Sequence, residues 1–95
     1  MALLDVAKRQ LGYLNADAQT ELLLQDLLDE GRSFLTTFDP DCDFESPSLE
    51  RSLLIDFVRY ALSNARDDFS KNYRDLLIKL SNRGKVKAYA GGKEE

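Results

Sequence analysis

The stretch from Ser46 to Ala65, SPSLERSLLIDFVRYALSNA, is more apolar than a helix on one side of a small protein requires. On a helix of 3.6 residues per turn its apolar side chains cover roughly two-thirds of the circumference, whereas packing on one side needs a stripe of about 100°. This predicts a central helix that is surrounded within its own fold or also buries a face against another chain. The remaining narrow polar strip is expected to face water or a channel: Ser52, Asp56, Arg59, Ser63 and Arg66.

Three further helices are predicted around this one, because apolar residues recur at helical spacing in three other segments. These segments run from Ala2 to Leu14, from Asp17 to about Phe38, and over residues 67–83. Gly31 lies on the apolar stripe of the second segment. A glycine inside a helix costs ~1 kcal/mol relative to alanine, so we expect another helix to approach closely there. The fold class is therefore all-α, a small bundle of about four helices in a domain of residues 1–84.

The C-terminal residues 85–95 are predicted to form an extended basic tail outside the bundle. Gly84 is a typical residue to follow the end of a helix. The next residues, KVKAYA, alternate as a strand does. A single strand has no partner in a helical chain, so this segment is either an irregular tail or an arm that pairs with a neighbouring subunit. The residues of the predicted arm are Lys85, Val86, Lys87, Ala88 and Tyr89.

Charge is divided unevenly along the chain, although the net charge is only −4. Residues 1–50 carry three basic and eleven acidic side chains, and residues 51–95 carry ten basic and six acidic ones. Such asymmetry suggests electrostatic complementarity with a partner or with other copies of the chain. The alternative is that both sets are simply solvated helix faces, since exposed ion pairs contribute little.

Enzymatic and metal-binding functions lack their usual residues. There is no histidine, the commonest general base and zinc ligand, and only one cysteine, Cys42. The glycine-rich nucleotide-binding patterns and the GxSxG pattern of hydrolases are also missing. We therefore expect no catalytic residues and no cofactor. A single cysteine fits synthesis in a reducing compartment, and no apolar run approaches the ~18 residues of a membrane span.

The loop DPDCDFESPSLE is the most motif-like part of the chain. Its ligand spacing is that of an EF-hand calcium loop, with helices on both sides. The sixth position, which requires glycine for its sharp turn, is Phe44. The simpler interpretation is an acidic loop that leads into the central helix, with Ser46 as N-cap and Pro47 as first helical residue. The weak candidate calcium ligands are Asp39, Asp41, Asp43 and Glu50.

Two aliphatic residues fall outside the apolar stripes of their helices. Leu22 lies among Asp26, Asp29 and Ser33. Ile78 lies among Lys71, Arg74 and Asp75 of the last predicted helix. Both are candidate contacts with another chain, although isolated exposed leucines are normal on monomers.

Taken together, the chain resembles the head–tail connector (adaptor) proteins of long-tailed bacteriophages and of prophages in Gram-positive bacteria. The resemblance covers nearly the whole chain as a diffuse pattern and is strongest from Leu53 to Tyr89. It rests on the run LLIDFVRYALSNA and on the later groups Asp68-Phe69, Asn72-Tyr73, Asp75-Leu76-Leu77, Gly84-Lys85-Val86 and Tyr89.

The resemblance implies a structural virion protein, made in the bacterial host cytoplasm, that forms a twelve-fold ring beneath the portal. The ring would extend the DNA channel and bind the portal and a downstream connector or stopper protein, and the arm at residues 85–89 would reach the portal or the neighbouring subunit. The resemblance implies no sequence-specific DNA binding, enzyme activity, cofactor or membrane contact. A ring needs contacts between two different faces of the subunit. The candidate interface residues are Leu22, Asp26, Asp29 and Glu30 on one face and Arg74, Ile78, Lys79 and Lys85 on the other.

Other functions remain open from the sequence. The main alternative is a small helical protein–protein adaptor or regulator unrelated to phage assembly. A nucleic-acid-binding domain is disfavoured by the net charge, since only the segment from Lys79 to Lys93 is basic. A calcium sensor would depend on the loop described above.

Overall fold

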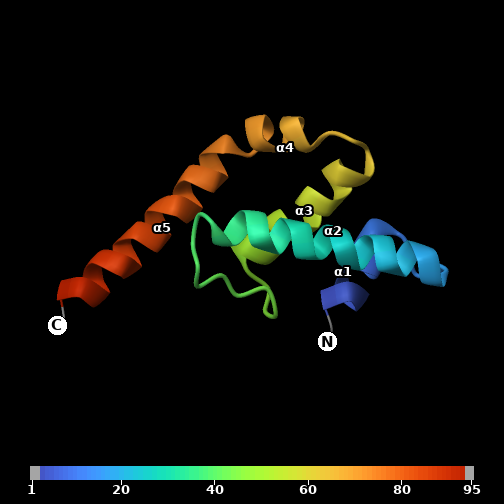
Figure 1. Ribbon diagram of the computed structural model, residues 1–95, viewed down its shortest axis with the longest axis horizontal. Coiled ribbons are helices and arrows are strands. Elements are labelled where there is room, and N and C mark those ends of the chain that lie inside the picture. The colour runs from blue at the N-terminus through green and yellow to red at the C-terminus, as the bar shows by residue number, and fades with distance from the viewer. Residues whose placement is uncertain (1–2, 94–95) are drawn as a thin grey trace.

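The computed structural model describes residues 3–93, with side-chain surroundings given for residues 3–85. Within residues 3–93 the chain forms five helices and no β-strand, which confirms the all-α fold class. A bundle of about four helices is broadly what α1 to α4 and the first part of α5 make (Figure 1). The helices are α1 (Leu3–Leu11), α2 (Ala18–Thr36), α3 (Leu49–Leu62), α4 (Arg66–Asn72) and α5 (Arg74–Lys93).

The predicted central helix is α3, and its excess of apolar surface is used within the chain. α3 packs against α1, α2 and α4, so three sides of the helix are covered. On the remaining side Ser52, Arg59 and Ser63 are exposed, as predicted, whereas Asp56 is half-buried and Arg66 belongs to α4. The buried residues of α3 are Glu50, Leu53, Leu54, Ile55, Phe57, Val58 and Ala61.

α2 and α3 approach closely at Gly31, as predicted. A Cβ added there would lie 2.6 Å from Leu54 Cδ1 and 2.8 Å from Phe57 Cδ2. Phe57 also stacks on Phe34 of α2 and meets Phe69 of α4 edge-on, with ring centroids 5.8 and 5.5 Å apart. Such aromatic pairs contribute about 0.5–1.5 kcal/mol each beyond their buried area. The aromatic cluster therefore holds the short helix α4 against the other two.

α1 is shorter than predicted and ends at Leu11. Gly12 follows with φ +83°, a left-handed conformation that favours glycine and ends the helix. Lys8 of α1 forms an ion pair with Glu21 of α2. α2 begins where the sequence indicates, because the Asp17 side chain accepts a hydrogen bond from the Thr20 backbone N–H at 2.8 Å.

The start of α3 differs from the prediction by two residues. The N-cap is Ser48, whose Oγ accepts from the Arg51 backbone N–H at 3.2 Å, and Leu49 is the first helical residue. Ser46 lies instead in a bend stabilised by Asp43, whose Oδ1 accepts from the backbone N–H groups of Glu45 and Ser46. Both serines are plausible caps in sequence, and the turn at Asp43 decides between them.

The predicted helix over residues 67–83 is divided in two at Tyr73, which lies outside both α4 and α5. The Tyr73 hydroxyl donates to Asp56 Oδ2 at 3.0 Å. Burial, together with this hydrogen bond and the charge of Asp56, raises the pKa of Tyr73 to about 12. α4 is thereby fixed beside α3, and α5 leaves in a new direction (Figure 1).

The predicted extended arm is wrong for the backbone of residues 85–93, which continues α5 as a helix through Gly84 to Lys93. A helix satisfies its own backbone hydrogen bonds, whereas a lone strand in residues 3–93 would have none to pair with. Figure 1 shows the last turns of α5 extending away from the other helices. The radius of gyration, 14.6 Å, accordingly exceeds the about 12 Å expected for a compact chain of this length. The side chains of the arm residues Val86, Lys87, Ala88 and Tyr89 lie outside those that the structure describes.

Candidate functional site

A buried ion cluster of Arg83, Asp39 and Glu50 joins α5 to the connection between α2 and α3. Arg83 Nε donates to Asp39 Oδ2 at 2.7 Å, and its two terminal nitrogens donate to Glu50 at 3.1 and 3.0 Å. Asp39 is fully buried and Glu50 is 4% exposed. Buried carboxylates are tolerated only when they are paired and hydrogen-bonded. The cluster therefore holds both carboxylates in the interior of the protein.

The backbone of the loop supplies the remaining hydrogen bonds of the cluster. The Asp41 N–H donates to Asp39 Oδ1 at 3.0 Å, and the Asp43 N–H donates to Glu50 Oε2 at 2.8 Å. Within residues 3–85 no buried side-chain nitrogen or oxygen lacks a hydrogen-bond partner. The cluster thus fixes the loop conformation as well as the position of α5.

Ionisation in the cluster follows from these contacts. Burial alone would raise the pKa of the Glu50 carboxyl, but hydrogen bonds from Arg83 and from the Asp43 N–H outweigh it and leave the pKa below its ordinary value. The hydrogen bonds from Arg83 to Glu50 raise the pKa of Arg83. Burial acts in the opposite direction, and the hydrogen bond to Asp39 raises the pKa further. Glu50 and Arg83 are therefore both charged at neutral pH.

Gly84 brings α5 against the end of α2. A Cβ added at Gly84 would lie 2.6 Å from the Phe38 carbonyl oxygen and 3.1 Å from Asp39 Cα. Both neighbours are backbone atoms, so a side chain here would displace the chain itself. Gly84 is required for this crossing and does not end the helix, which corrects its predicted role.

The candidate calcium ligands do not form a metal site. Asp39 and Glu50 bind Arg83, and the Asp43 side chain caps the local turn. Among the described residues no group of three or more histidine, cysteine, aspartate or glutamate side chains could hold a metal ion. At the sixth position of the motif Phe44 is 8% exposed and packs in the core. The acidic spacing is explained by the ion cluster and the loop turn.

The outer face of α2 is acidic and carries exposed leucine. Leu22 is 67% exposed, and Asp26 and Asp29 beside it are exposed as well. Leu23 is 47% exposed. Glu30 has an intramolecular partner, because Arg66 donates to both its oxygens at 2.6 and 3.0 Å. The "acidic face" below means Leu22, Asp26, Asp29 and Ser33.

The residues of the predicted basic patch fall on two different sides of α5. Arg74, Ile78 and Lys85 are spaced by four and seven residues, which places them on one strip of the helix. Ile78 is 48% exposed, and Arg74 and Lys85 are also exposed. Lys79 lies on a different side of α5 by its helical position. The "basic strip" below means Arg74, Ile78 and Lys85; Lys85 joins it only because the helix continues past Gly84.

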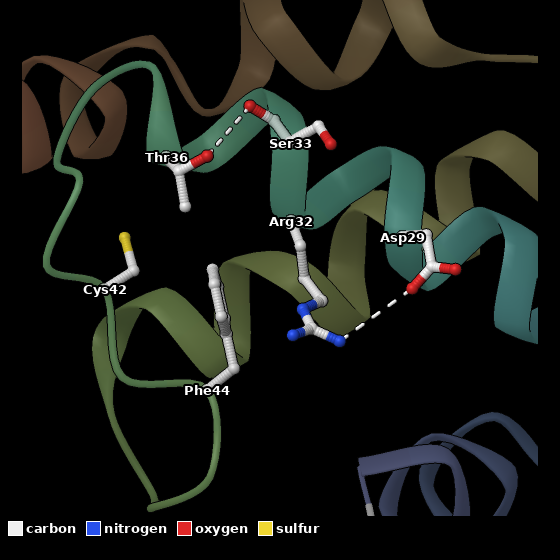
Figure 2. A pocket seen from close by; sticks show the side chains of 6 residues that line it. All are labelled: Asp29, Arg32, Ser33, Thr36, Cys42 and Phe44. Atoms are coloured by element: carbon white, nitrogen blue, oxygen red, sulfur yellow. Dashed lines mark hydrogen bonds and ion pairs between the residues drawn. The ribbon is translucent and has the colours of Figure 1, made fainter.

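A hollow of about 480 Å³ adjoins the acidic face (Figure 2). One wall comes from α2 and the other from the loop before α3. Thr36 turns its hydroxyl back to the Ser33 carbonyl, at 3.1 Å, and its methyl group points into the hollow. Arg32 reaches towards Asp29, with Nη1 to Oδ1 at 3.8 Å. The lining residues are Asp29, Arg32, Ser33, Thr36, Cys42 and Phe44.

Several of these partners could not be assigned from sequence. Arg83 and Arg66 each pair with a residue more than thirty positions away, and nothing in local spacing indicates such pairs. Leu22 and Ile78 were indicated by their positions outside the apolar stripes, and both are exposed. Phe44 offered a signal of its own, since a large aromatic residue in an acidic loop is usually buried.

No helix in the described part of the chain is both long enough and apolar enough to span a membrane. Comparison with known proteins finds no protein-family model, no curated protein and no solved structure that matches this chain.

Proposed function

We propose that this protein is a structural subunit of a bacteriophage virion, a head–tail connector that forms a ring beneath the portal. The observation that carries the proposal is the presence of two exposed faces of opposite charge on different helices, each with an aliphatic residue. Contacts between unlike faces generate rings when the rotation closes. The resemblance of residues 53–89 to connector proteins supports the same assignment, as does the all-α fold.

In this function the subunit is made in the host cytoplasm and joins the virion without enzyme activity or cofactor. The ring, twelve-fold in the virion, binds the portal above and a stopper protein below. The exposed polar side of α3, with Ser52 and Arg59, is a candidate channel lining. DNA passes through without sequence-specific binding.

Electron microscopy of the protein mixed with purified portal complex tests the proposal. We expect a ring of density on one end of the portal. Asp26→Lys on the acidic face should weaken ring formation, whereas Asp68→Lys, an exposed acidic residue of α4, should leave it intact. A protein that neither binds the portal nor associates with itself would refute the proposal and favour the adaptor alternative.

A further inference from the structure

We propose that the hollow beside the acidic face is a socket for Ile78 of a second copy of the chain. The basic strip of one subunit would lie along the acidic face of the next. This inference rests on the proposed function in one respect: it names the contact through which copies of a connector ring meet.

The centre of the hollow suits a branched aliphatic side chain. Phe44 is held in the core at its base, and the Thr36 methyl group and the Cys42 side chain lie around the opening (Figure 2). The Thr36 hydroxyl is already bonded to the Ser33 carbonyl. An entering Ile78 would therefore remove apolar surface from water, at about 25 cal/mol per Å², and would leave the hydrogen bond of Thr36 intact.

The rim of the hollow attracts cations. Asp29 and Arg32 in its lining offset one another, with their charged groups 3.8 Å apart. Three more exposed carboxylates are near the lining residues in the sequence: Asp26, one helical turn before Asp29 on α2, and Asp41 and Asp43, on either side of Cys42. The rim is therefore negative overall. Complementary charge at an interface orients the partners and excludes wrong ones.

The basic strip has the matching arrangement. Ile78 lies between Arg74, one helical turn before it, and Lys85, two turns after it. Within residues 3–85 neither Arg74 nor Lys85 forms an ion pair, so both charges are available to a partner. An apolar side chain between two cations fits a hollow in which Phe44, Cys42 and the Thr36 methyl group form an apolar patch among polar residues.

The strip cannot reach the hollow of its own subunit. Arg83 and Gly84 fix the other side of α5 against Phe38 and Asp39. Ile78 lies away from the buried positions Leu77 and Gly84 and faces solvent. An Ile78 side chain that enters the hollow must therefore come from a second copy. Because hollow and strip are different surfaces, the contact is head-to-tail and repeats from copy to copy.

Two variants test this directly by sedimentation velocity. Ile78→Asp removes the strip and keeps the hollow, and Ser33→Trp fills the hollow and keeps the strip; both residues are exposed, so folding is checked by circular dichroism. Each variant alone should lose all species larger than the monomer that the wild type forms. Mixed in equal amounts, the two should give dimers and nothing larger. Association of Ile78→Asp at wild-type level would overturn the proposal, as would a monomeric mixture when the wild type associates.

Disulfide trapping covers the case of weak association. Ile78→Cys should cross-link to Cys42 of another copy under mild oxidation and give a ladder of covalent oligomers. The ladder should vanish in the Cys42→Ser, Ile78→Cys double variant. Leu14→Cys, at another exposed leucine (65%), is the matched control. Cross-linking of Ile78→Cys no greater than this control, or persistence without Cys42, would overturn the proposal.

The outcomes separate this inference from the connector function. Portal rings that still form with Ile78→Asp would refute the socket and leave the connector proposal standing. A Cys42-dependent ladder in a protein that ignores the portal would support the socket and refute the connector.

Discussion

The guanidinium of Arg83 donates to the carboxylate of Asp39 over 2.7 Å, across 44 positions of the sequence. Asp39 follows the end of α2 and is fully buried, while Arg83 keeps about a third of its side chain in solvent. Together with Glu50, this pair determines where α5 lies relative to the rest of the chain. Its removal is the most informative single change.

Arg83→Met should destabilise the protein by about 3 kcal/mol, because breaking a buried pair leaves an uncompensated buried charge. The expected loss is at the low end of the about 3–5 kcal/mol typical of a broken buried pair, since Arg83 is partly exposed. Urea denaturation gives the measurement. Adding Asp39→Asn and Glu50→Gln should recover part of the loss, and Arg32→Met, in an exposed pair, should change stability by less than about 0.5 kcal/mol. A triple variant no more stable than Arg83→Met would contradict the electrostatic explanation.

Stability should fall in acid because of Glu50. Its folded pKa lies below the ordinary value of 4.5, so the unfolded chain takes up the proton first as the pH drops. The contribution is fully present above pH 4.5 and is lost as the pH falls through the folded pKa. Thermal melting between neutral and acid pH measures this loss. Glu50→Gln should have a shallower acid dependence, and a dependence equal to the wild type would disprove the assignment.

Gly31 and Gly84, which are both buried within helices, should respond differently to alanine. Gly84→Ala places a methyl group against the Phe38 carbonyl and Asp39 Cα, which are backbone atoms. We expect a loss of about 1–3 kcal/mol from overpacking. Gly31→Ala meets side-chain atoms of Leu54 and Phe57, which can shift, and the better helix propensity of alanine offsets part of the strain. Chemical denaturation should therefore show the larger loss for Gly84→Ala; the reverse order would contradict the close crossing of α5.

Ser48→Ala should cost about 1 kcal/mol, the usual effect of removing an N-cap side chain. Ser46→Ala is the matched control two residues away, and it should leave the free energy of unfolding nearly unchanged because the Ser46 contact to Asp43 uses its backbone N–H. Equal effects of the two substitutions would contradict the assignment of Ser48 as the N-cap of α3.

Calcium should leave the melting temperature unchanged. Two of the four acidic residues with EF-hand spacing already bind Arg83, so a cation would have to displace a guanidinium from a buried site. Thermal melts in excess calcium and in chelator are compared. A stabilisation that rises with calcium concentration, as binding to the folded state requires, would revive the calcium interpretation.

The sequence predicted those parts of the fold that depend on local periodicity. The central helix, the close approach at Gly31 and the exposure of Leu22 and Ile78 all follow from helical spacing. The N-cap at Ser48 was missed because a turn at Asp43 competes with it. The alternating pattern KVKAYA is typical of a strand, but without a partner strand these residues continue α5, so the pattern alone does not indicate their helical form.

The ion cluster could not be predicted for a different reason. The Asp39–Glu50 spacing was visible, but the cation that it binds lies on another helix, and a long-range pair leaves no periodic trace. The predicted basic patch also differs from the structure. Because α5 continues as a helix past Gly84, Lys85 lies in line with Ile78, whereas Lys79 lies on another side of the helix.

The crossing at Gly84 is the point from which the last turns of α5 extend away from the other helices. The nine residues from 85 to 93 continue the helix for about 14 Å beyond that crossing. A tilt of about 10° there would displace the far end by about 2 Å, since displacement grows with arm length. A rotation too small to break the bonds of Arg83 would thus be amplified at Lys93, and the direction of the last turns of α5 is decided at Asp39 and Glu50.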